Sequence, residues 1–440
     1  MNSPKTHPEK LPRGAEILDP GELSSFVEGF LNRRELFLKA VEYFGSPLFF
    51  IEDDILRNRA QLFRKAFSRF LPDIRIYYAL KSNNHPEVAR ILVESGLGLD
   101  VSSGRELEIA LETDCSEIIF SGPGKTTAEL SRAGACRDRV TLLIDSFGEL
   151  ERLGKLTAGY PEPIRCGVRL TVPGEGRLWT KFGIPSQRLA EFIDAARLQP
   201  GIQFQGIQFH TSWNLDPSSQ VSFLSLLAAV LKKLPPADAA QIKFIDIGGG
   251  FWPEEGEWLL PENFPEKGML GDIREPMIHC RRPARAIGEF AAEIGKIFHE
   301  KIFPFQKVQV RMEPGRWICH PALQILLTVI DLKNPELAIT DGGTNAVGWE
   351  RYETEYFPVI NLSRPSGKDH RCLIVGSLCT PHDIWGFSYP LNGIWEGDIL
   401  LIPNQGAYTY SLRQDFIKPV PAAVINTRSE IRMYYPRIKS

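Results

Sequence analysis

The 440-residue sequence has few of the features that mark a nucleic-acid-binding, membrane or metal-dependent protein. Its formal net charge is −3, so no basic field is available to attract nucleic acid or an anionic membrane surface. No run of about 18 apolar residues occurs, and the first residues lack the apolar core of a signal peptide. The eight histidines do not have metal-ligand spacing such as HExxH. We therefore expect no nucleic-acid, membrane or metal partner.

The seven cysteines are scattered and form no CxxC pair. In a long chain this distribution is typical of reduced thiols, and it favours a cytoplasmic location. The hydrophobic content of 43% is enough for a full core, and the length allows two domains.

Strand-like and helix-like segments alternate in the first part of the chain. Apolar strands that are covered on their outer face require helical crossovers, so eight such strands predict an α/β fold with a (β/α)₈ TIM-type barrel. An open doubly wound sheet is the alternative topology. Residues 85–95, 186–198 and 283–298 carry apolar side chains at helical spacing. The predicted strands are residues 76–81, 96–103, 117–122, 140–146, 165–171, 204–210, 243–250 and 308–314.

A C-terminal all-β domain is predicted where β-rich runs follow one another without intervening helices. The strand-like stretch 47–54 precedes the barrel, and we expect it to join this β domain from the other end of the chain. The expected domains are an N-terminal extension over 1–45, the barrel over 46–318 and the β domain over 319–440. The β-rich runs are residues 323–332, 337–343, 371–377, 398–404 and 422–428.

Residues 251–282 form an insertion that is rich in proline, glycine and acidic residues. It follows the carboxyl end of a strand and is longer than an ordinary connection, so we interpret it as a lid or a substrate-facing loop. A disordered surface loop is the alternative.

Polar residues stand at the carboxyl ends of the predicted strands, where barrels of this kind build their active sites. Lys81 ends an apolar strand and has two interpretations. It is either an ion-pair partner of Asp100 or Glu313, or a nucleophilic amine that forms a Schiff base with a carbonyl. The full set of strand-end residues is Lys81, Asp100, Ser146, Arg169, His210, residues 248–250, Glu313 and Arg316.

Two motifs on adjacent strands predict a phosphate site. The glycines of DIGGGF (246–251) let backbone N–H groups crowd around an anion, and EPGR (313–316) supplies an arginine for a forked contact. Barrels frequently bind phosphate at this location. A Schiff-base lysine and a phosphate cradle in one barrel mouth imply pyridoxal 5'-phosphate (PLP) as the cofactor.

With these motifs the chain resembles the fold-type III PLP-dependent decarboxylases, specifically the ornithine/diaminopimelate decarboxylase-like family, which shares its barrel with alanine racemase-like enzymes. The resemblance covers residues 47–420. The motifs that carry it occur in the family's order: YYALKSN, LDVSSGREL, KFG at Lys181, DIGGGF, EPGR, GSLCTPHD (376–383) and QGAY (405–408).

The resemblance implies catalytic roles for four positions. Lys81 would hold PLP covalently, His210 would stack on the pyridine ring, and Glu313 would pair with the ring nitrogen. Cys379 would reach in from a second subunit to protonate the substrate, so a homodimer with shared active sites is implied.

Other matching positions would surround the cofactor or join the subunits. Lys181 and Asp383 would bridge the two subunits, with an ordinary surface ion pair as the alternative. The positions that would hold the phosphate are Gly249, Gly250, Arg316 and Tyr408, and those that would lie near the cofactor are Asp100, Glu106 and Arg169.

Glu313 favours decarboxylation among the reactions of this fold. A carboxylate there keeps the pyridine nitrogen protonated, and the protonated ring draws off the electron pair left when CO₂ departs. Racemase-like relatives place an arginine at that nitrogen instead. The thiol of Cys379 suits a proton donor because its proton is mobile near neutral pH; the alternative is a small buried hydrophobic residue. Without the surrounding motifs, His210 would be interpreted as a core histidine and Tyr408 as an aromatic residue at a domain interface.

The chain departs from the family pattern at two places. Many members read HxGS after the sixth strand, whereas this chain reads HTSW, so Trp213 stands where the phosphate-binding serine would be, and Ser212 and Thr211 are the candidates to substitute for it. After the catalytic cysteine, basic-amino-acid decarboxylases carry an acid that meets the distal ammonium of the substrate. This chain has Thr380 there, which leaves Asp341 to meet an ammonium.

The segment 341–357 is rich in Trp, Tyr and Arg and, with the long insertion, suits a larger substrate that bears carboxylates. We therefore predict a decarboxylase that removes the α-carboxylate of an amino acid or an amino-acid conjugate, such as a citrate–diamino acid intermediate of siderophore biosynthesis. The alternatives are a diaminopimelate, ornithine or lysine decarboxylase, then a racemase or a non-catalytic PLP-binding regulator. The expected substrate-binding residues are Asp341, Thr380 and Asp383.

Overall fold

In the computed structural model the chain forms two compact units. The barrel unit comprises residues 56–254 and 285–318, and the β unit lies within residues 1–55, 255–284 and 319–440. The described residues are 11, 13–174, 177–259, 279–348, 359–365, 372–389 and 393–434.

Eight parallel strands close into a barrel in the order β12-β3-β4-β5-β6-β7-β8-β9. The predicted (β/α)₈ barrel is confirmed, and each predicted strand overlaps an observed one. The strands are β3 (Ile74–Ala79), β4 (Gly98–Val101), β5 (Ile118–Phe120), β6 (Val140–Ile144), β7 (Ile164–Arg169), β8 (Ile202–Gln208), β9 (Phe244–Asp246) and β12 (Gln309–Met312).

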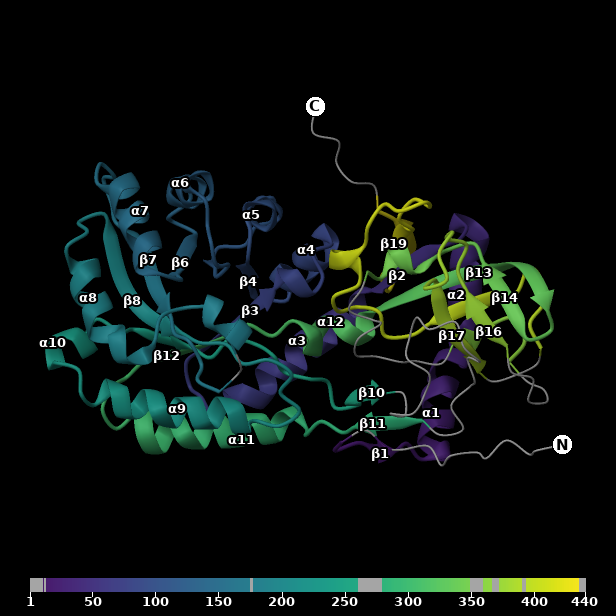
Figure 1. Ribbon diagram of the computed structural model, residues 1–440, viewed down its shortest axis with the longest axis horizontal. Coiled ribbons are helices and arrows are strands. Elements are labelled where there is room, and N and C mark those ends of the chain that lie inside the picture. Colours follow the sequence, from purple (N-terminus) through teal and green to yellow (C-terminus); the bar gives the residue numbers. More distant parts are fainter. Residues whose placement is uncertain are drawn as a thin grey trace. The chain divides into compact units, whose positions relative to one another are not determined.

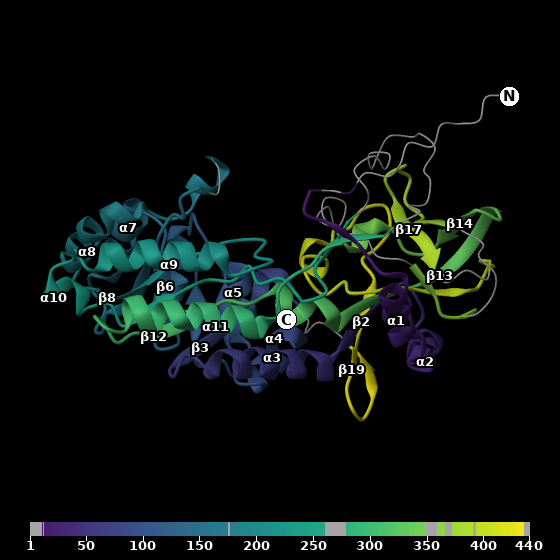
Figure 2. The same cartoon turned by 90° about the horizontal axis from the view of Figure 1, so that it is seen from below.

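Helices connect the successive strands and cover the outside of the barrel, and α9 and α11 run side by side in both views (Figures 1 and 2). Side-chain caps begin several of them. Thr126 and Glu129 form a capping box on α6, and the strand-end residue Ser146 caps α7. The helices are α3 (Asp53–Ser68), α4 (Pro86–Glu94), α5 (Gly104–Leu111), α6 (Thr127–Ala135), α7 (Phe147–Thr157), α8 (Leu189–Arg197), α9 (Ser218–Leu231), α10 (Pro236–Ala239), α11 (Ile287–Ile297) and α12 (Arg316–Cys319).

Large side chains fill the inside of the barrel below its mouth. Tyr77, Ile119, Leu143 and Phe244 form one buried cluster. Glycines on neighbouring strands make room for the two rings, since a Cβ at Gly206 would lie 2.6 Å from the Phe244 ring, and one at Gly98 would lie 2.5 Å from the Tyr77 ring. The interior is therefore a packed layer that supports the polar residues above it.

The β unit contains a nine-stranded sheet in the order β14-β16-β17-β15-β18-β13-β2-β19-β20, and β14 also pairs with β13. The N-terminal strand β2 (Leu48–Glu52) pairs with β13 and β19, which confirms that it joins the C-terminal strands. The other strands are β13 (Leu323–Asn334), β14 (Leu337–Thr340), β15 (Val359–Asn361), β16 (Leu373–Val375), β17 (Ile384–Tyr389), β18 (Ile399–Ile402), β19 (Ala422–Asn426) and β20 (Ile431–Met433).

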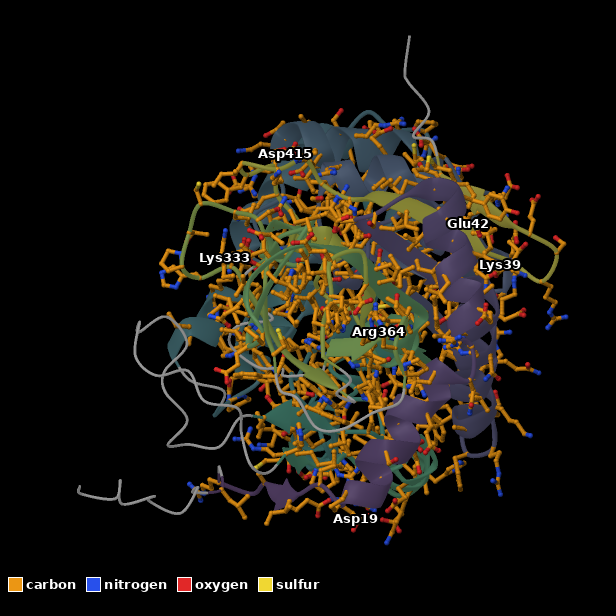
Figure 3. The ribbon with its side chains drawn as sticks, turned by 90° about the vertical axis from the view of Figure 1, so that its right-hand side faces the viewer. Asp19, Lys39, Glu42, Lys333, Arg364 and Asp415 are labelled. Carbon is orange, nitrogen blue, oxygen red and sulfur yellow. The ribbon has the colours of Figure 1, made fainter. Side chains whose placement is uncertain are left out.

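Two N-terminal helices, α1 (Pro20–Leu31) and α2 (Arg34–Phe44), pack against this sheet. Asp19 caps α1 by accepting from the amide of Gly21, and it lies at the start of that helix in Figure 3. Phe37 on α2 packs with Phe50 of β2 in the core, whereas Lys39 and Glu42 lie on the exposed side of the helix. The amphipathic face of α2 thus covers the N-terminal strand.

The two ends of the 251–282 insertion lie in a small separate sheet. There β11 (Cys280–Arg282) pairs with β10 (Glu257–Leu259) and with β1 (Glu16–Ile17). Residues 260–278 lie outside the described residues, so the lid interpretation remains a prediction. Among the described residues no helix is long and apolar enough to cross a membrane, and no cluster of three His, Cys, Asp or Glu side chains could hold a metal ion.

Candidate active site

The parallel register brings the strand-end residues of the barrel unit to one mouth. Asp100 pairs in register with Ala79 on one side, and Asp246 lies opposite Gln208 and Arg311 on its two neighbours. Because side chains alternate along each strand, residues two positions from the buried cluster point into the same interior. The mouth is therefore lined by side chains from strands far apart in sequence.

Lys81 lies in a single 3₁₀ turn, Leu80–Ser82, directly after β3. Its Nζ is 3.4 Å from Oδ2 of Asp100, and its side chain is 33% exposed, whereas the Asp100 carboxylate is fully buried. Ser121 donates a hydrogen bond to the other Asp100 oxygen. The ion pair with Asp100, one of the two interpretations from sequence, is thus present, and it holds the amine at the mouth while leaving it accessible.

The turn that carries Lys81 packs directly against the EPGR loop. Pro314 accepts a hydrogen bond from the amide of Ala79 at 3.2 Å. A Cβ at Gly315 would lie 2.8 Å from the Ser82 side chain, so only glycine allows this close approach. This contact explains how Lys81 and Glu313, which are distant in the chain, come to one site.

Glu313 is a buried carboxyl at the bottom of the mouth. Gln208 donates to both of its oxygens, at 3.3 and 3.4 Å. Burial raises the pKa of Glu313 well above its usual value; Asp100 and Asp246 raise it further, and Lys81 opposes them. A cation placed against this carboxyl would therefore be strongly favoured.

His210 is a neutral ring whose proton is fixed by its neighbours. Burial lowers its pKa well below 6.5, and the charges of Lys81 and Arg169 lower it further. The amide of Gly249 donates to Nδ1 at 3.1 Å, so the ring proton is on Nε2. The 3.9 Å contact between Nδ1 and Glu313 is accordingly not an ion pair. A flat, neutral ring in this position suits stacking on an aromatic group.

The glycine loop after β9 has the shape expected of an anion cradle. Gly248 and Gly250 have φ of +67° and +79°, which side chains rarely adopt. A Cβ at Gly249 would lie 2.3 Å from the carbonyl oxygen of Glu313, and one at Gly250 would lie 2.1 Å from that of Thr211. Only glycine therefore allows this loop to lie so close to the backbone of Glu313 and Thr211.

The HTSW segment is tied to this loop by a buried amide. Asn214 donates to Oγ1 of Thr211 at 2.8 Å and to the carbonyl of Gly249 at 3.4 Å. Thr211 is fully buried, Ser212 is half-buried, and Trp213 is 53% exposed with a left-handed φ of 49°. Which of Ser212 and Thr211 replaces the family's serine remains a prediction.

Two arginines at the mouth lie on aromatic rings. The guanidinium carbon of Arg316 is 4.3 Å from the centroid of the Trp252 ring, which is buried. Arg169 lies 4.4 Å from the Phe182 ring, and Nζ of Lys181 is 4.7 Å from the same ring. Such stacking fixes a planar guanidinium in one orientation, as a bidentate anion contact requires.

Asp246 and Gln208 are site residues that the sequence analysis did not identify. Asp246 is fully buried, accepts from the amide of Gly248 at 2.9 Å, and has a pKa raised to about 7, mainly by burial and against the opposing charge of Arg311. The signal that could have identified them is the alternation of side chains along a strand, because residues two positions apart point to the same face. Gln208 stands two residues before His210, and Asp246 stands two residues after Phe244. Glu106, which was identified, is buried and accepts from the amide of Ser102 at 2.8 Å; burial raises its pKa.

The remaining expected site residues belong to the β unit. Cys379 is exposed, and Thr380 beside it is half-buried. Tyr408 has a left-handed φ of 57°. This backbone conformation is uncommon for residues other than glycine, and such conformations cluster at functional sites. Asp341 accepts hydrogen bonds from the Ser46 hydroxyl and the Thr328 amide, and Asp383 is buried. The roles of these residues at the barrel mouth remain predictions.

Comparison with known proteins identifies the family. Residues 54–320 match the family model described as the pyridoxal-binding domain of pyridoxal-dependent decarboxylases. The chain belongs to this family. It is therefore a PLP-dependent amino-acid decarboxylase, as predicted, and PLP is its cofactor.

Relatives and solved structures agree with this assignment. The chain is 27% identical over 406 residues to diaminopimelate decarboxylase of Methanothermobacter thermautotrophicus, with 88% of each chain covered. It is 25% identical to 2-[(L-alanin-3-ylcarbamoyl)methyl]-2-hydroxybutanedioate decarboxylase of Staphylococcus aureus, over 81% of this chain and 88% of the relative. The structure of diaminopimelate decarboxylase from M. jannaschii in complex with L-lysine has the same fold, with a TM-score of 0.75, 22% identity and 90% of each chain covered.

The barrel mouth fits PLP. The buried Glu313 carboxyl lacks a cationic hydrogen-bond partner among the described residues, and a protonated pyridine nitrogen would supply one. The glycine loop and Arg316 offer backbone donors and a fixed guanidinium for a phosphate. When bound, PLP supplies the electron-withdrawing ring that takes up the electron pair released as CO₂ departs.

Proposed function

We propose that this decarboxylase acts on an amino-acid conjugate that bears additional carboxylates, such as a citrate–diamino acid intermediate of siderophore biosynthesis. The observation that carries the proposal is that neither of the two residues expected to meet a distal ammonium offers it a free negative charge. Thr380 is uncharged, and Asp341 is already engaged within its own unit.

Asp341 is a poor partner for a substrate ammonium. One of its oxygens accepts from the hydroxyl of Ser46 and the other from the amide of Thr328, at 3.0 Å. Burial raises its pKa above 3.8, although these hydrogen bonds oppose the shift. A carboxylate that is committed in this way holds strand β13 and the Ser46 turn together, and it offers little further charge to a ligand.

The name of the Staphylococcus aureus relative supports the proposal, since its substrate is a hydroxybutanedioate joined through a carbamoyl group to an alanine. Diaminopimelate decarboxylation is the second candidate, and the 27% identity to the Methanothermobacter enzyme favours it.

We further propose the residue roles of the site. In the barrel unit, Lys81 holds PLP, His210 stacks on the PLP ring, and Glu313 keeps a proton on the ring nitrogen. The charge of Asp100 holds Lys81 in place, and the charge of Arg169 acts in the same way on Glu313. Cys379 of a second subunit delivers the proton to the substrate carbon, so the active unit is a homodimer, placed in the cytoplasm. The residues proposed for the phosphate are Gly249, Gly250, Arg316 and Tyr408, and Thr380 is proposed to face the substrate.

A substrate panel tests the proposal. The purified holoenzyme is incubated with citrate-conjugated diamino acids, meso-diaminopimelate, ornithine and lysine, and mass spectrometry records the loss of CO₂. We expect kcat/KM for a conjugate to exceed that for every free diamino acid by at least about 100-fold, because unpaired polar groups penalise the wrong substrate strongly. A preference for diaminopimelate would favour the second candidate, and a preference for ornithine or lysine would contradict both.

A further inference from the structure

Asp383 is buried between two loops of the β unit, and one of these loops carries Cys379. Its side chain is almost fully buried, although it lies only four residues after an exposed cysteine. The first loop follows β14 and spans residues 341–346; the second connects β16 to β17 and spans residues 376–383. Both loops meet at the Asp383 carboxylate.

Each oxygen of this carboxylate accepts hydrogen bonds from a different loop. Oδ1 accepts from the amide and the hydroxyl of Thr344, at 2.7 and 3.0 Å. Oδ2 accepts from the amide of Leu378 at 2.7 Å, and Leu378 immediately precedes Cys379. The backbone at the cysteine is therefore tied to the first loop through a charged acceptor, the strong kind of hydrogen bond.

Two glycines show how closely the carboxylate fits. A Cβ at Gly376 would lie 2.2 Å from Oδ2 of Asp383, and one at Gly343 would lie 2.9 Å from the same atom. The carbonyl of Asp383 also accepts from the amide of Gly376 at 2.9 Å. The pocket around the carboxylate is thus shaped for an aspartate and has no room for a longer acid.

The donors to Asp383 are two amides and a hydroxyl, and none of them is a cation. Burial raises the pKa of Asp383, and the bonds from Thr344 and Leu378 oppose that shift. Two neighbouring bonds also reach the first loop. Ser377 of the second loop donates to the carbonyl of Asp341 at 3.1 Å, and the indole of Trp385 on β17 donates to the carbonyl of Gly342 at 3.1 Å. This set of contacts fixes backbone geometry, which a surface ion pair does not require.

We propose that Asp383 is a positioning residue, which fixes the backbone of Leu378 and so orients the thiol of Cys379 for proton delivery. The inference rests on the proposed role of Cys379 as proton donor. It gives Asp383 a task within its own subunit, separate from the bridge to Lys181 that the family resemblance implies.

The test compares Asp383→Asn with a matched control. An asparagine of the same size has one acceptor oxygen, so either Leu378 or Thr344 loses its acceptor and faces an NH₂ group. Asp398→Asn is the control, because Asp398 is also buried in the β unit and accepts from the Trp395 amide at 3.0 Å and from Arg364 at 3.0 Å. Both variants should lose stability, but only Asp383→Asn should affect Cys379.

Three readouts separate positioning from folding. In the cofactor-free protein, hydrogen exchange of the peptide over residues 376–384 should quicken about tenfold or more in Asp383→Asn and stay unchanged in Asp398→Asn. In the holoenzyme, kcat should fall about 10- to 100-fold with little change in KM. Turnover in deuterated water should give a stereochemically mixed label, since solvent then competes with the thiol.

The outcomes distinguish failure of this inference from failure of the proposed function. Wild-type kcat and a single stereochemistry of the label in Asp383→Asn would overturn the positioning role, as would equal losses in Asp398→Asn. If Cys379→Ser retains wild-type rate and label, Cys379 is not the proton donor, and the proposed role of that residue is wrong. A loss in Cys379→Ser without a loss in Asp383→Asn overturns only the inference.

Discussion

Single side chains at the barrel mouth show why sequence identified some site residues and not others. Lys81, His210 and Glu313 stand out locally because each is a polar group at the end of an apolar strand. Gln208 and Asp246 are the last residues of β8 and β9, but the predicted strands extended past them to residues 210 and 250, so they did not stand at a predicted strand end. Their importance comes from the partners that barrel closure places beside them, Glu313 and Arg311, and register between distant strands cannot be read from either segment alone.

Glu313→Gln tests the proposed hold on the ring nitrogen. Glutamine keeps the shape of the side chain but cannot keep that nitrogen protonated. We expect kcat to fall at least about tenfold, which is the rate change that corresponds to a shift of one unit in the pKa of the ring nitrogen. Because the variant removes a buried carboxyl with a raised pKa, thermal unfolding of the cofactor-free protein should not move to lower temperature. Glu300→Gln on the exposed barrel surface is the control. A large loss of stability together with normal kcat would contradict the role.

Asp246 should make the cofactor-free protein less stable as the pH rises. Its pKa is raised from 3.8 to about 7, so the folded state binds this proton more tightly than the unfolded state does. The stability that this tighter proton binding contributes is therefore fully present below about pH 4 and is lost progressively as the pH rises to about 7. In Asp246→Asn the midpoint of thermal unfolding should vary less over this range than in wild type. Parallel curves for the two proteins would rule out this contribution.

At the scale of elements, the strands were predicted well and the turns between them less well. All eight barrel strands were identified, because apolar runs between helices are a strong pattern. The boundaries moved where tertiary contacts decide them, and Lys81 lies in a 3₁₀ turn after its strand because Gly315 packs against Ser82. In the nine-stranded sheet, β15, β17 and β20 were missed; β15 and β20 are three residues long, and β17 contains a glycine.

Gly249→Ala tests the glycine loop as an element. Its Cβ would lie 2.3 Å from the backbone oxygen of Glu313, so the loop after β9 must shift. We expect the Kd for PLP, measured by absorbance titration of the cofactor-free protein, to rise at least about tenfold. Gly288→Ala in the first turn of α11 is the matched control, because a Cβ there meets nothing within 4 Å. Equal Kd values for the two variants would exclude the cradle.

At the scale of the whole molecule, sequence predicted the fold class and the family, but not the substrate. The motifs occur in this chain in the same order as in the family, and they therefore identify the fold. The substrate proposal rests on Thr380 and Asp341, whereas residues 260–278 and 349–358 lie outside the described residues. One fold can serve several substrates, so motifs that identify the fold do not identify the substrate.

Shared active sites predict complementation between two inactive variants. If Lys81 and Cys379 of one site come from different subunits, mixing Lys81→Ala with Cys379→Ala and exchanging subunits creates hybrid dimers with one intact site. Random exchange should restore roughly a quarter of the wild-type sites, since half of the dimers are hybrids with one intact site of two. Activity that stays at the level of the separate variants would show that each subunit completes its own site.

The central claim is that Lys81 holds the cofactor, and its most direct measurement is peptide mapping after borohydride reduction of the holoenzyme. Reduction converts a Schiff base into a stable amine, and the account predicts one phosphopyridoxyl group, on the peptide that contains Lys81. The reduced protein should lose its absorbance band near the visible range and its activity together. A label on another lysine, or no label on a protein that retains PLP, would contradict the account.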